Sequence, residues 1–213
     1  TLGTGEVDTL DNDTINMLWL GGPLGTMERT SIASFLHHGY QVHVYSWHDN
    51  LCTGWPAGAV ARDARDVLPE EYCFQYANGS WSACSNLFRW VLLRDRGGWW
   101  SDCDVVMLRP FDFHPSQFVC GWEDPPDVKR KRYIGSAPVY SPPHHPVITY
   151  CAAQAMAWGK NIQWGQAGPK LLTTAVERFG RLDDVLPETA FQPVHYARAR
   201  SMLQEPAIAV PED

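Results

Sequence analysis

The sequence has no long apolar run and no surplus of basic charge. Its uncharged apolar stretches are short, such as Met17–Leu20 and Val105–Leu108, whereas a helix that crosses a bilayer needs about 20 apolar residues. Lysine and arginine total 17 against 24 aspartates and glutamates, so the net charge is −7. A surface that holds duplex nucleic acid needs an excess of basic residues. The composition therefore excludes a membrane span and argues against a nucleic-acid partner.

The sequence also lacks paired cysteine motifs. Its cysteines stand at positions 52, 73, 84, 103, 120 and 151, and no two have the Cys-x-x-Cys spacing of zinc ribbons or thioredoxin-like sites. Six cysteines in 213 residues do not make a disulfide scaffold. We expect mostly buried thiols in a reducing compartment, although an even count permits one or two disulfides. No signal-peptide pattern opens the chain, which favours a cytoplasmic location.

The sequence does contain enough apolar material for one core. Hydrophobic residues make up 45% of the 213 residues and charged residues 19%, as in globular proteins. We expect a single domain over residues 1–213, with a loose polar lead-in over 1–14 and an insertion or loop region near the site over 112–146. Most of the ten tryptophans, eight tyrosines and eight phenylalanines belong to the core, and two or three are expected to stack on flat rings in a site.

Hydrophobic periodicity predicts an α/β fold. The first half follows a strand–helix–strand pattern, the unit of a parallel α/β sheet. We expect strands over residues 15–20, 40–47, 99–108 and 191–195. We expect helices over residues 26–38, 59–67, 82–96, 145–158 and 169–178. Ser82 is the expected N-cap of the third helix, and Pro169 stands in the favoured first turn of the last one.

Residues 85–104 carry the most chemical information. They read as a helix, a Gly97-Gly98 hinge and an apolar strand that ends in Asp102-Cys-Asp104. Alternate residues of a strand point to one face, so the two carboxylates would repel each other unless a cation or proton lay between them. Such oxygen ligands suit Mg²⁺ or Mn²⁺, which often link protein carboxylates to substrate phosphates. The alternative is that the aspartates cap a turn and face water.

Three segments resemble, in the same order, motifs of the GT-A glycosyltransferases with a DXD motif. This group includes the Och1-type mannosyltransferases, the α-1,4-galactosyltransferases and the glucosylating domain of the large clostridial toxins. Residues 85–104 resemble its helix with an Asp/Arg pair, its Gly-Gly, aromatic residue and Asp-x-Asp, except that Asn86 replaces the usual Asp. Leu18–Gly22 is similar to its first-strand motif, and Gly168–Thr173 to its Gly-Pro-x-x-x-Thr motif.

The resemblance implies a GT-A-like, Rossmann-like fold with a mainly parallel sheet flanked by helices. It also implies a metal-dependent retaining glycosyltransferase that moves a hexose or N-acetylhexosamine from a nucleotide-sugar, with UDP-sugars favoured. The acceptor is open: a glycan, a protein, a lipid-linked sugar or a small molecule. By the resemblance, Asp104 binds Mn²⁺ or Mg²⁺ directly, Asp102 does so through water, and Trp19 stacks on the base. The candidate catalytic residues are Asn86, Arg89, Asp102 and Asp104. The candidate donor-binding residues are Trp19, Leu20, Gly21, Asn86, Arg89, Trp100, Asp102 and Gly168.

Several of these residues have a structural alternative. Arg89 contacts the sugar or phosphate, or forms a salt bridge that fixes the helix to the Asp-x-Asp segment. Trp19 stacks on a base or fills the core. The basic run Lys129–Arg132 has two interpretations. In one it is a mobile loop over the site that meets phosphates or an anionic acceptor, and in the other it is a solvated loop. His195 approaches the metal or is a structural histidine. Glu123 and Asp124 face the acceptor or solvent.

Two other functions also remain open. One is a degenerate relative that binds a nucleotide-sugar or glycan without turnover, which would suit the loss of charge at Asn86. The other is a metal-dependent phosphoesterase or nucleotidyltransferase, which would use the same paired aspartates.

Overall fold

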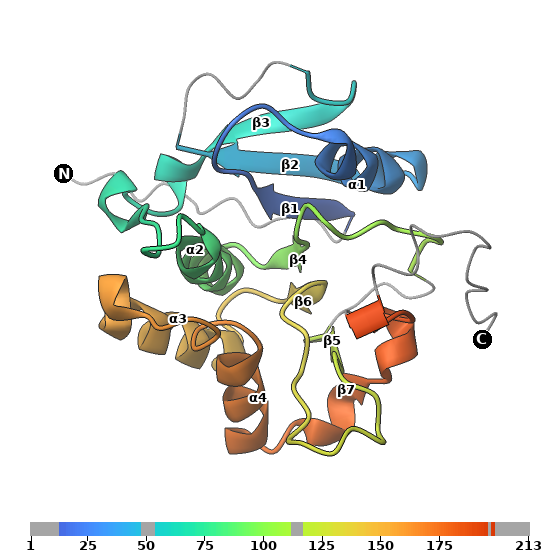
Figure 1. Cartoon of the computed structure of the whole chain (residues 1–213), viewed down its shortest axis with the longest axis vertical. Coiled ribbons are helices and arrows are strands. Elements are labelled where there is room, and N and C mark those ends of the chain that lie inside the picture. The colour runs from blue at the N-terminus through green and yellow to red at the C-terminus, as the bar shows by residue number, and fades with distance from the viewer. Residues whose placement is uncertain (1–12, 48–53, 112–116, 196, 199–213) are drawn as a thin grey trace.

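A five-stranded sheet forms the centre of the molecule (Figure 1). The computed structural model describes residues 13–47, 54–111, 117–195, 197 and 198. The strands follow the order β3 (Ala59–Asp63), β2 (Gln41–Ser46), β1 (Thr14–Leu18), β4 (Gly98–Trp100) and β6 (Val139–Ser141). All neighbouring pairs are parallel except β4 and β6, which are antiparallel. The prediction of an α/β fold with a mainly parallel sheet is confirmed.

Both faces of this sheet are covered, because successive strand residues point to opposite sides. On β1, Ile15 and Met17 belong to a core cluster with helix α1 (Thr26–His37). Leu18 points the other way, into a cluster with helix α2 (Ser82–Asp95). Strand β2 buries every residue after its first, including the polar His43 and Ser46.

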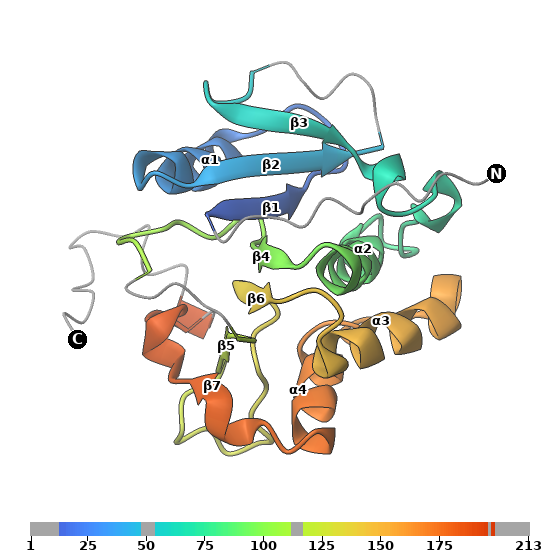
Figure 2. The same ribbon diagram turned by 180° about the vertical axis from the view of Figure 1, so that it is seen from behind.

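The second half of the chain adds two helices and a small sheet beside β6 (Figure 2). Helices α3 (Pro146–Trp158) and α4 (Pro169–Arg178) lie together with α2. Strands β5 (Cys120–Gly121) and β7 (Val185–Leu186) pair in parallel as a separate sheet. Short 3₁₀ turns link these elements at Ala64–Asp66, Glu70–Tyr72, Gly159–Asn161, Leu182–Asp184 and Glu188–Ala190. Among the described residues, no helix is both long and apolar enough to cross a membrane.

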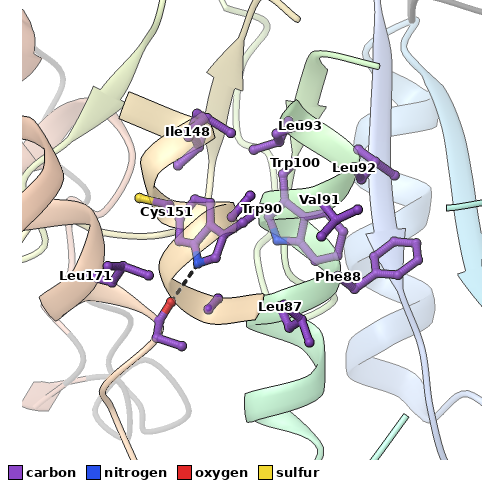
Figure 3. Packing of buried hydrophobic residues seen from close by; sticks show 14 of the residues in the cluster. Leu87, Phe88, Trp90, Val91, Leu92, Leu93, Trp100, Ile148, Cys151 and Leu171 are labelled. Atoms are coloured by element: carbon purple, nitrogen blue, oxygen red, sulfur yellow. Dashed lines mark hydrogen bonds between the residues drawn. The ribbon is translucent and has the colours of Figure 1, made fainter. Parts of the chain in front are cut away.

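Trp90 lies at the centre of the contact between α2 and α3 (Figure 3). Its indole nitrogen donates a hydrogen bond of 2.7 Å to the carbonyl of Ala167. A buried tryptophan needs such a partner for its N–H group. The bond also holds the segment that leads into α4 against α2, and this contact helps to build the site described below.

Three predicted elements are wrong. The strand over 99–108 ends at Trp100, because the following residues leave the sheet and bond to α1 through Ser31 and Ser34. Residues 59–67 form strand β3 and a 3₁₀ turn, since the free edge of β2 outweighs the local helical pattern. Residues 191–195 form a turn and loop instead of a strand.

The helix predictions over 26–38, 82–96, 145–158 and 169–178 are confirmed to within one residue at each end. Ser82, however, is the first helical residue and not the N-cap, which is Trp81. The hydroxyl of Ser80 accepts the Ser82 N–H instead, at 3.2 Å. Five cysteines are free thiols, four of them buried, while Cys52 lies outside the described residues.

Candidate functional site

The Asp-x-Asp segment forms a turn at the carboxyl edge of the parallel strands. The Ser101 N–H donates to the carbonyl of Asn16 on β1 at 3.0 Å, and the buried Cys103 thiol lies 3.7 Å from the carbonyl of Leu18. Asp102 and Asp104 therefore flank Cys103 outside the sheet, which corrects the expectation that they lie in a strand. Ligands of open α/β sheets bind at this edge.

Arg89 ties α2 to this turn. The residue is only 2% exposed, and its Nη2 donates to Asp102 Oδ1 at 2.6 Å while Nη1 donates to the Ser136 carbonyl at 2.6 Å. Its guanidinium also lies over the rings of Trp90 and Trp100. Burial lowers the pKa of Arg89, and the negative charges of Asp102 and Asp104 oppose that shift. Both terminal nitrogens are bonded to protein, as the salt-bridge alternative expects.

The two aspartates differ in their surroundings. Asp102 Oδ1 accepts bonds from Arg89 and from the Trp100 indole at 3.0 Å, while its side chain remains 36% exposed. Asp104 accepts no hydrogen bond from a side chain of the described residues. Asp104 is exposed, but neighbouring protein atoms remove part of the water around its carboxyl group. This partial desolvation, and then the negative charge of Asp102, raises the pKa of Asp104. Arg89 compensates one of the two negative charges, and the raised pKa of Asp104 shows that the compensation there is incomplete.

A third carboxylate, Glu28, contributes to this negative charge. It lies in the first turn of α1, and its charge is one of the weaker causes that raise the pKa of Asp104. No cluster of three side chains that could hold a metal occurs in the described residues. Mg²⁺ and Mn²⁺ commonly take one or two carboxylates together with water and substrate phosphates. Asp102 and Asp104 fit that kind of site.

Asn86 and Gly168 lie against each other, although 82 residues separate them in the sequence. Asn86 precedes Arg89 by three residues on α2, so both side chains lie on the same side of the helix. A Cβ atom on Gly168 would lie 3.2 Å from the Asn86 amide nitrogen. Gly168 is the N-cap of α4, where backbone N–H groups are unbonded within the helix. Two of the predicted motifs therefore meet at one place.

The segment after β1 brings the remaining predicted residues to the same edge. The Trp19 N–H donates to the Tyr45 carbonyl at 3.0 Å, and its indole donates to the Gly22 carbonyl at 2.8 Å. The Trp19 ring is half-buried. Leu20 points into the core, so only its backbone is available to a ligand. Gly21 has a φ of 128°, which an L side chain rarely adopts.

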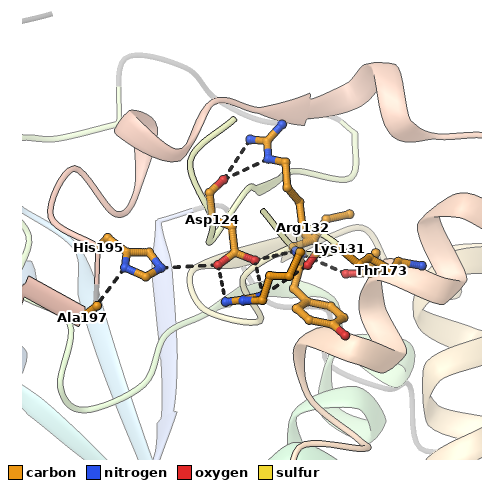
Figure 4. A network of polar contacts seen from close by, with 9 residues as sticks. Asp124, Lys131, Arg132, Thr173, His195 and Ala197 are labelled. Atoms are coloured by element: carbon orange, nitrogen blue, oxygen red, sulfur yellow. Dashed lines mark hydrogen bonds and ion pairs between the residues drawn. The ribbon is translucent and has the colours of Figure 1, made fainter. Parts of the chain in front are cut away.

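The basic run is bound to acidic groups (Figure 4). Arg130 pairs with the fully buried Asp124 at 2.7 Å, and Lys131 pairs with Glu177 at 2.8 Å. Arg132 donates to the Asp124 backbone carbonyl at 2.9 Å. Arg130 and Lys131 are therefore paired with carboxylates of the fold, and Arg132 Nη2 also lies 3.6 Å from a carboxylate oxygen of Glu188. Arg130 and Lys131 remain 43% and 53% exposed, so the run is a solvated surface segment that ion pairs attach to the fold.

The structure also locates His195, Glu123 and Asp124, which lie beside this run. Nε2 of His195 lies 3.3 Å from Asp124 Oδ1, so the histidine has a structural partner. Asp124 is buried and faces neither solvent nor an acceptor. Glu123 is half-buried, and burial followed by the charge of Asp124 raises its pKa.

Sequence reasoning missed two members of the site. Ser136 contributes a backbone carbonyl to Arg89, and no sequence pattern marks a backbone contact that spans 47 residues. Glu28 stands in the first turn of a predicted helix, where acidic residues are common for local reasons. Its proximity to Asp104 depends on how α1 packs.

Comparison with known proteins supports the fold. Neither a family model nor a curated protein matches the chain. The structure is similar to a solved structure described as PaToxG Glycosyltransferase, with a TM-score of 0.58 and 18% sequence identity. The similar region covers 81% of this chain and 70% of the other. The chain therefore has a fold like that of a glycosyltransferase.

Proposed function

We propose that this chain is a metal-dependent retaining glycosyltransferase with a nucleotide-sugar donor, most favourably a UDP-sugar. The observation that carries the proposal is the turn after β4, where Arg89 holds Asp102 next to Asp104, a carboxylate to which no side chain of the described residues donates. The similarity of the fold to that of a glycosyltransferase supports it. The resemblance of three sequence segments to GT-A motifs supports it as well, and retention and the type of donor rest on that resemblance alone.

Asp102 and Asp104 would hold Mn²⁺ or Mg²⁺. When bound, the ion would neutralise the charge that develops on the nucleoside diphosphate leaving group. Arg89 and Trp100 both bond to Oδ1 of Asp102, so they orient the carboxylate and leave its second oxygen to a ligand. Arg89 is thus proposed as a positioning residue.

Asn86 and Gly168 would contact the donor sugar. The Asn86 amide can both donate and accept hydrogen bonds, which suits sugar hydroxyls. The backbone N–H groups at the start of α4 offer donors to a polar or anionic group nearby. The half-buried ring of Trp19, which its own turn fixes, would stack on the nucleotide base.

The test is donor turnover in the absence of an acceptor. The protein is incubated with a panel of UDP- and GDP-sugars and Mn²⁺ or EDTA, and both nucleoside diphosphate release and thermal stability are followed. We expect release from one donor that EDTA abolishes. Asp104→Asn should reduce release about 100-fold or more, since transition-state charge stabilisation is commonly worth that much. Asp183→Asn, an exposed aspartate in a 3₁₀ turn near β7, is the matched control and should retain full release.

Asn86 favours a second candidate, a relative that binds the donor without turnover. The amide keeps hydrogen-bonding capacity but lacks the charge that the family has at this position. Metal-dependent stabilisation by one nucleotide-sugar, without release even after Asn86→Asp, would favour this candidate. Release of inorganic phosphate or pyrophosphate instead of nucleoside diphosphate would overturn the transferase proposal.

A further inference from the structure

Trp164 is the most exposed large hydrophobic side chain among the described residues, with 64% of its surface accessible. It stands in the segment between Asn161 and α4. Its ring centroid lies 5.4 Å from that of Tyr76, and the ring planes are inclined by 52°. Single exposed apolar residues are common, but here two aromatic side chains from distant segments form one surface.

Two hydrogen-bonded turns hold this aromatic pair in place. The Gln166 N–H donates to the Gln163 carbonyl at 3.0 Å, and the Gln163 N–H donates to the Gln166 side chain at 2.9 Å. The Tyr76 hydroxyl donates to the Gln163 carbonyl at 2.9 Å, which joins the two turns. The Tyr76 N–H in turn bonds to the Ser80 carbonyl at 2.9 Å. These bonds fix the Tyr76 ring and the backbone that carries Trp164, so less conformational freedom is lost when a ligand stacks there.

The two segments that carry the pair are polar and uncharged, and the Lys170 ammonium lies beside them, 3.9 Å from the position of a Cβ atom on Gly165. Residues 73–81 and 162–168 contain no lysine, arginine, aspartate or glutamate. Amide side chains are frequent in them: Gln75, Asn78, Gln163 and Gln166. Phosphates and charged peptides are recognised by charged groups, which these segments lack. An aromatic face in segments rich in neutral amides suits a ligand with apolar faces and a hydroxyl edge, as a pyranose ring has.

The pair also lies close to the proposed donor site. Trp164 precedes Gly168 by four residues, so their Cα atoms are separated by at most about 14 Å. Gly168 in turn lies against Asn86. Tyr76 stands in the segment that leads into α2, the helix that carries Asn86 and Arg89. A chain of a few sugar units could therefore extend from the aromatic pair toward the proposed reaction centre.

We propose that Trp164 and Tyr76 form a subsite for a neutral pyranose ring of an oligosaccharide acceptor. The sugar ring stacks on the exposed face of Trp164, and its hydroxyls bond to the side chains of Gln163 and Gln166. The role of the oligosaccharide as an acceptor rests on the proposed function. Its binding to this subsite does not depend on that function.

The binding test uses the full chain without donor or added metal. Maltotetraose, cellotetraose, chitotetraose and lacto-N-tetraose are titrated by calorimetry and examined by saturation-transfer NMR. We expect at least one of them to bind, and Trp164→Ala to weaken that binding about tenfold or more, the usual effect of truncating a central aromatic contact. Phe179→Ala is the matched control, because Phe179 is 41% exposed and also packs edge-on against a tyrosine, at the opposite end of α4. It should bind as the wild type does.

The outcomes separate this subsite from the proposed function. Trp164→Ala should lose sugar binding, whereas Phe179→Ala should keep both sugar binding and acceptor-independent donor release. Absence of donor release with intact sugar binding would overturn the transferase and leave the subsite standing. No binding by any of the four sugars, or equal binding by Trp164→Ala, would overturn the subsite. A wild-type dimer that Trp164→Ala converts to a monomer would overturn it as well, by assigning this surface to a second copy of the chain.

Discussion

Replacing Arg89 by Met tests the geometry of the site most directly. Methionine has a similar length and suits the apolar surroundings of the side chain, but it cannot donate to Asp102 or to the Ser136 carbonyl. The substitution therefore leaves the 102–104 turn without its link to α2. We expect a less stable protein in which Asp102 is no longer oriented.

The size of the effect follows from the two lost bonds. A hydrogen bond that involves a charged group contributes about 1.5–3 kcal/mol. The Ser136 carbonyl is buried and would lose the Arg89 donor, whereas Asp102 is 36% exposed and keeps its bond from Trp100. Water can thus replace part of the second interaction, and the ion pair is discounted accordingly. We expect a loss of about 3 kcal/mol, or a fall in Tm of about 6–12 °C for a chain of this size.

Thermal unfolding of four proteins measures this effect: the wild type, Arg89→Met, Asp102→Asn and the double variant. Each single substitution leaves the other residue, Asp102 or Arg89, without its partner. The double variant should therefore lose less stability than the sum of the losses in the two single variants. Arg89→Met should also reduce the stabilisation that Mn²⁺ and the donor give together. A Tm for Arg89→Met within about 2 °C of the wild type would refute the reasoning, because it would mean that the buried pair contributes almost nothing.

Two further predictions concern other parts of the fold. Gly97→Ala should cost about 3 kcal/mol in a denaturant titration, because φ is 69° and the new Cβ would lie 2.7 Å from a proline ring. Gly79→Ala has a similar φ but open space around it and should cost only about 1 kcal/mol, so equal losses would contradict the steric argument. Glu123→Gln should raise Tm at pH 7, since a carboxyl whose pKa is raised in the folded state binds its proton more tightly there and destabilises the fold once ionised. This advantage should shrink as the pH falls toward about 4, the usual range of a glutamate, and an advantage that does not change with pH would contradict it.

Local patterns predicted the elements whose residues determine their own conformation. The helix over Pro169–Arg178 was predictable because a proline in the first turn precedes a regular apolar stripe. Strand β3 was not, since alanine, valine and arginine at 59–62 suit a helix as well as a strand. Only the free edge of β2 decides between the two.

Some features of the candidate site could likewise be read from the sequence, and others depend on the fold. The candidate residues could be read from the sequence, because Asp102 and Asp104 stand two residues apart after Gly-Gly-Trp-Trp, and Asn86 and Arg89 lie three apart on one helix. The sequence also marked the three segments that resemble a known family. These features depend on spacing along the chain, which a sequence displays directly.

The tertiary structure alone decided which groups meet. It brought Gly168 to Asn86, gave Arg89 the Ser136 carbonyl, paired cations of the basic run with carboxylates, and set Trp164 beside Tyr76. The Arg130–Asp124 pair is local, because its residues are six positions apart in one loop. The other contacts join distant segments, and Asn86 and Gly168 are 82 positions apart. The packing of α3 against both α2 and α4 helps to bring Asn86 and Gly168 together, and that packing depends on the shape of the whole core.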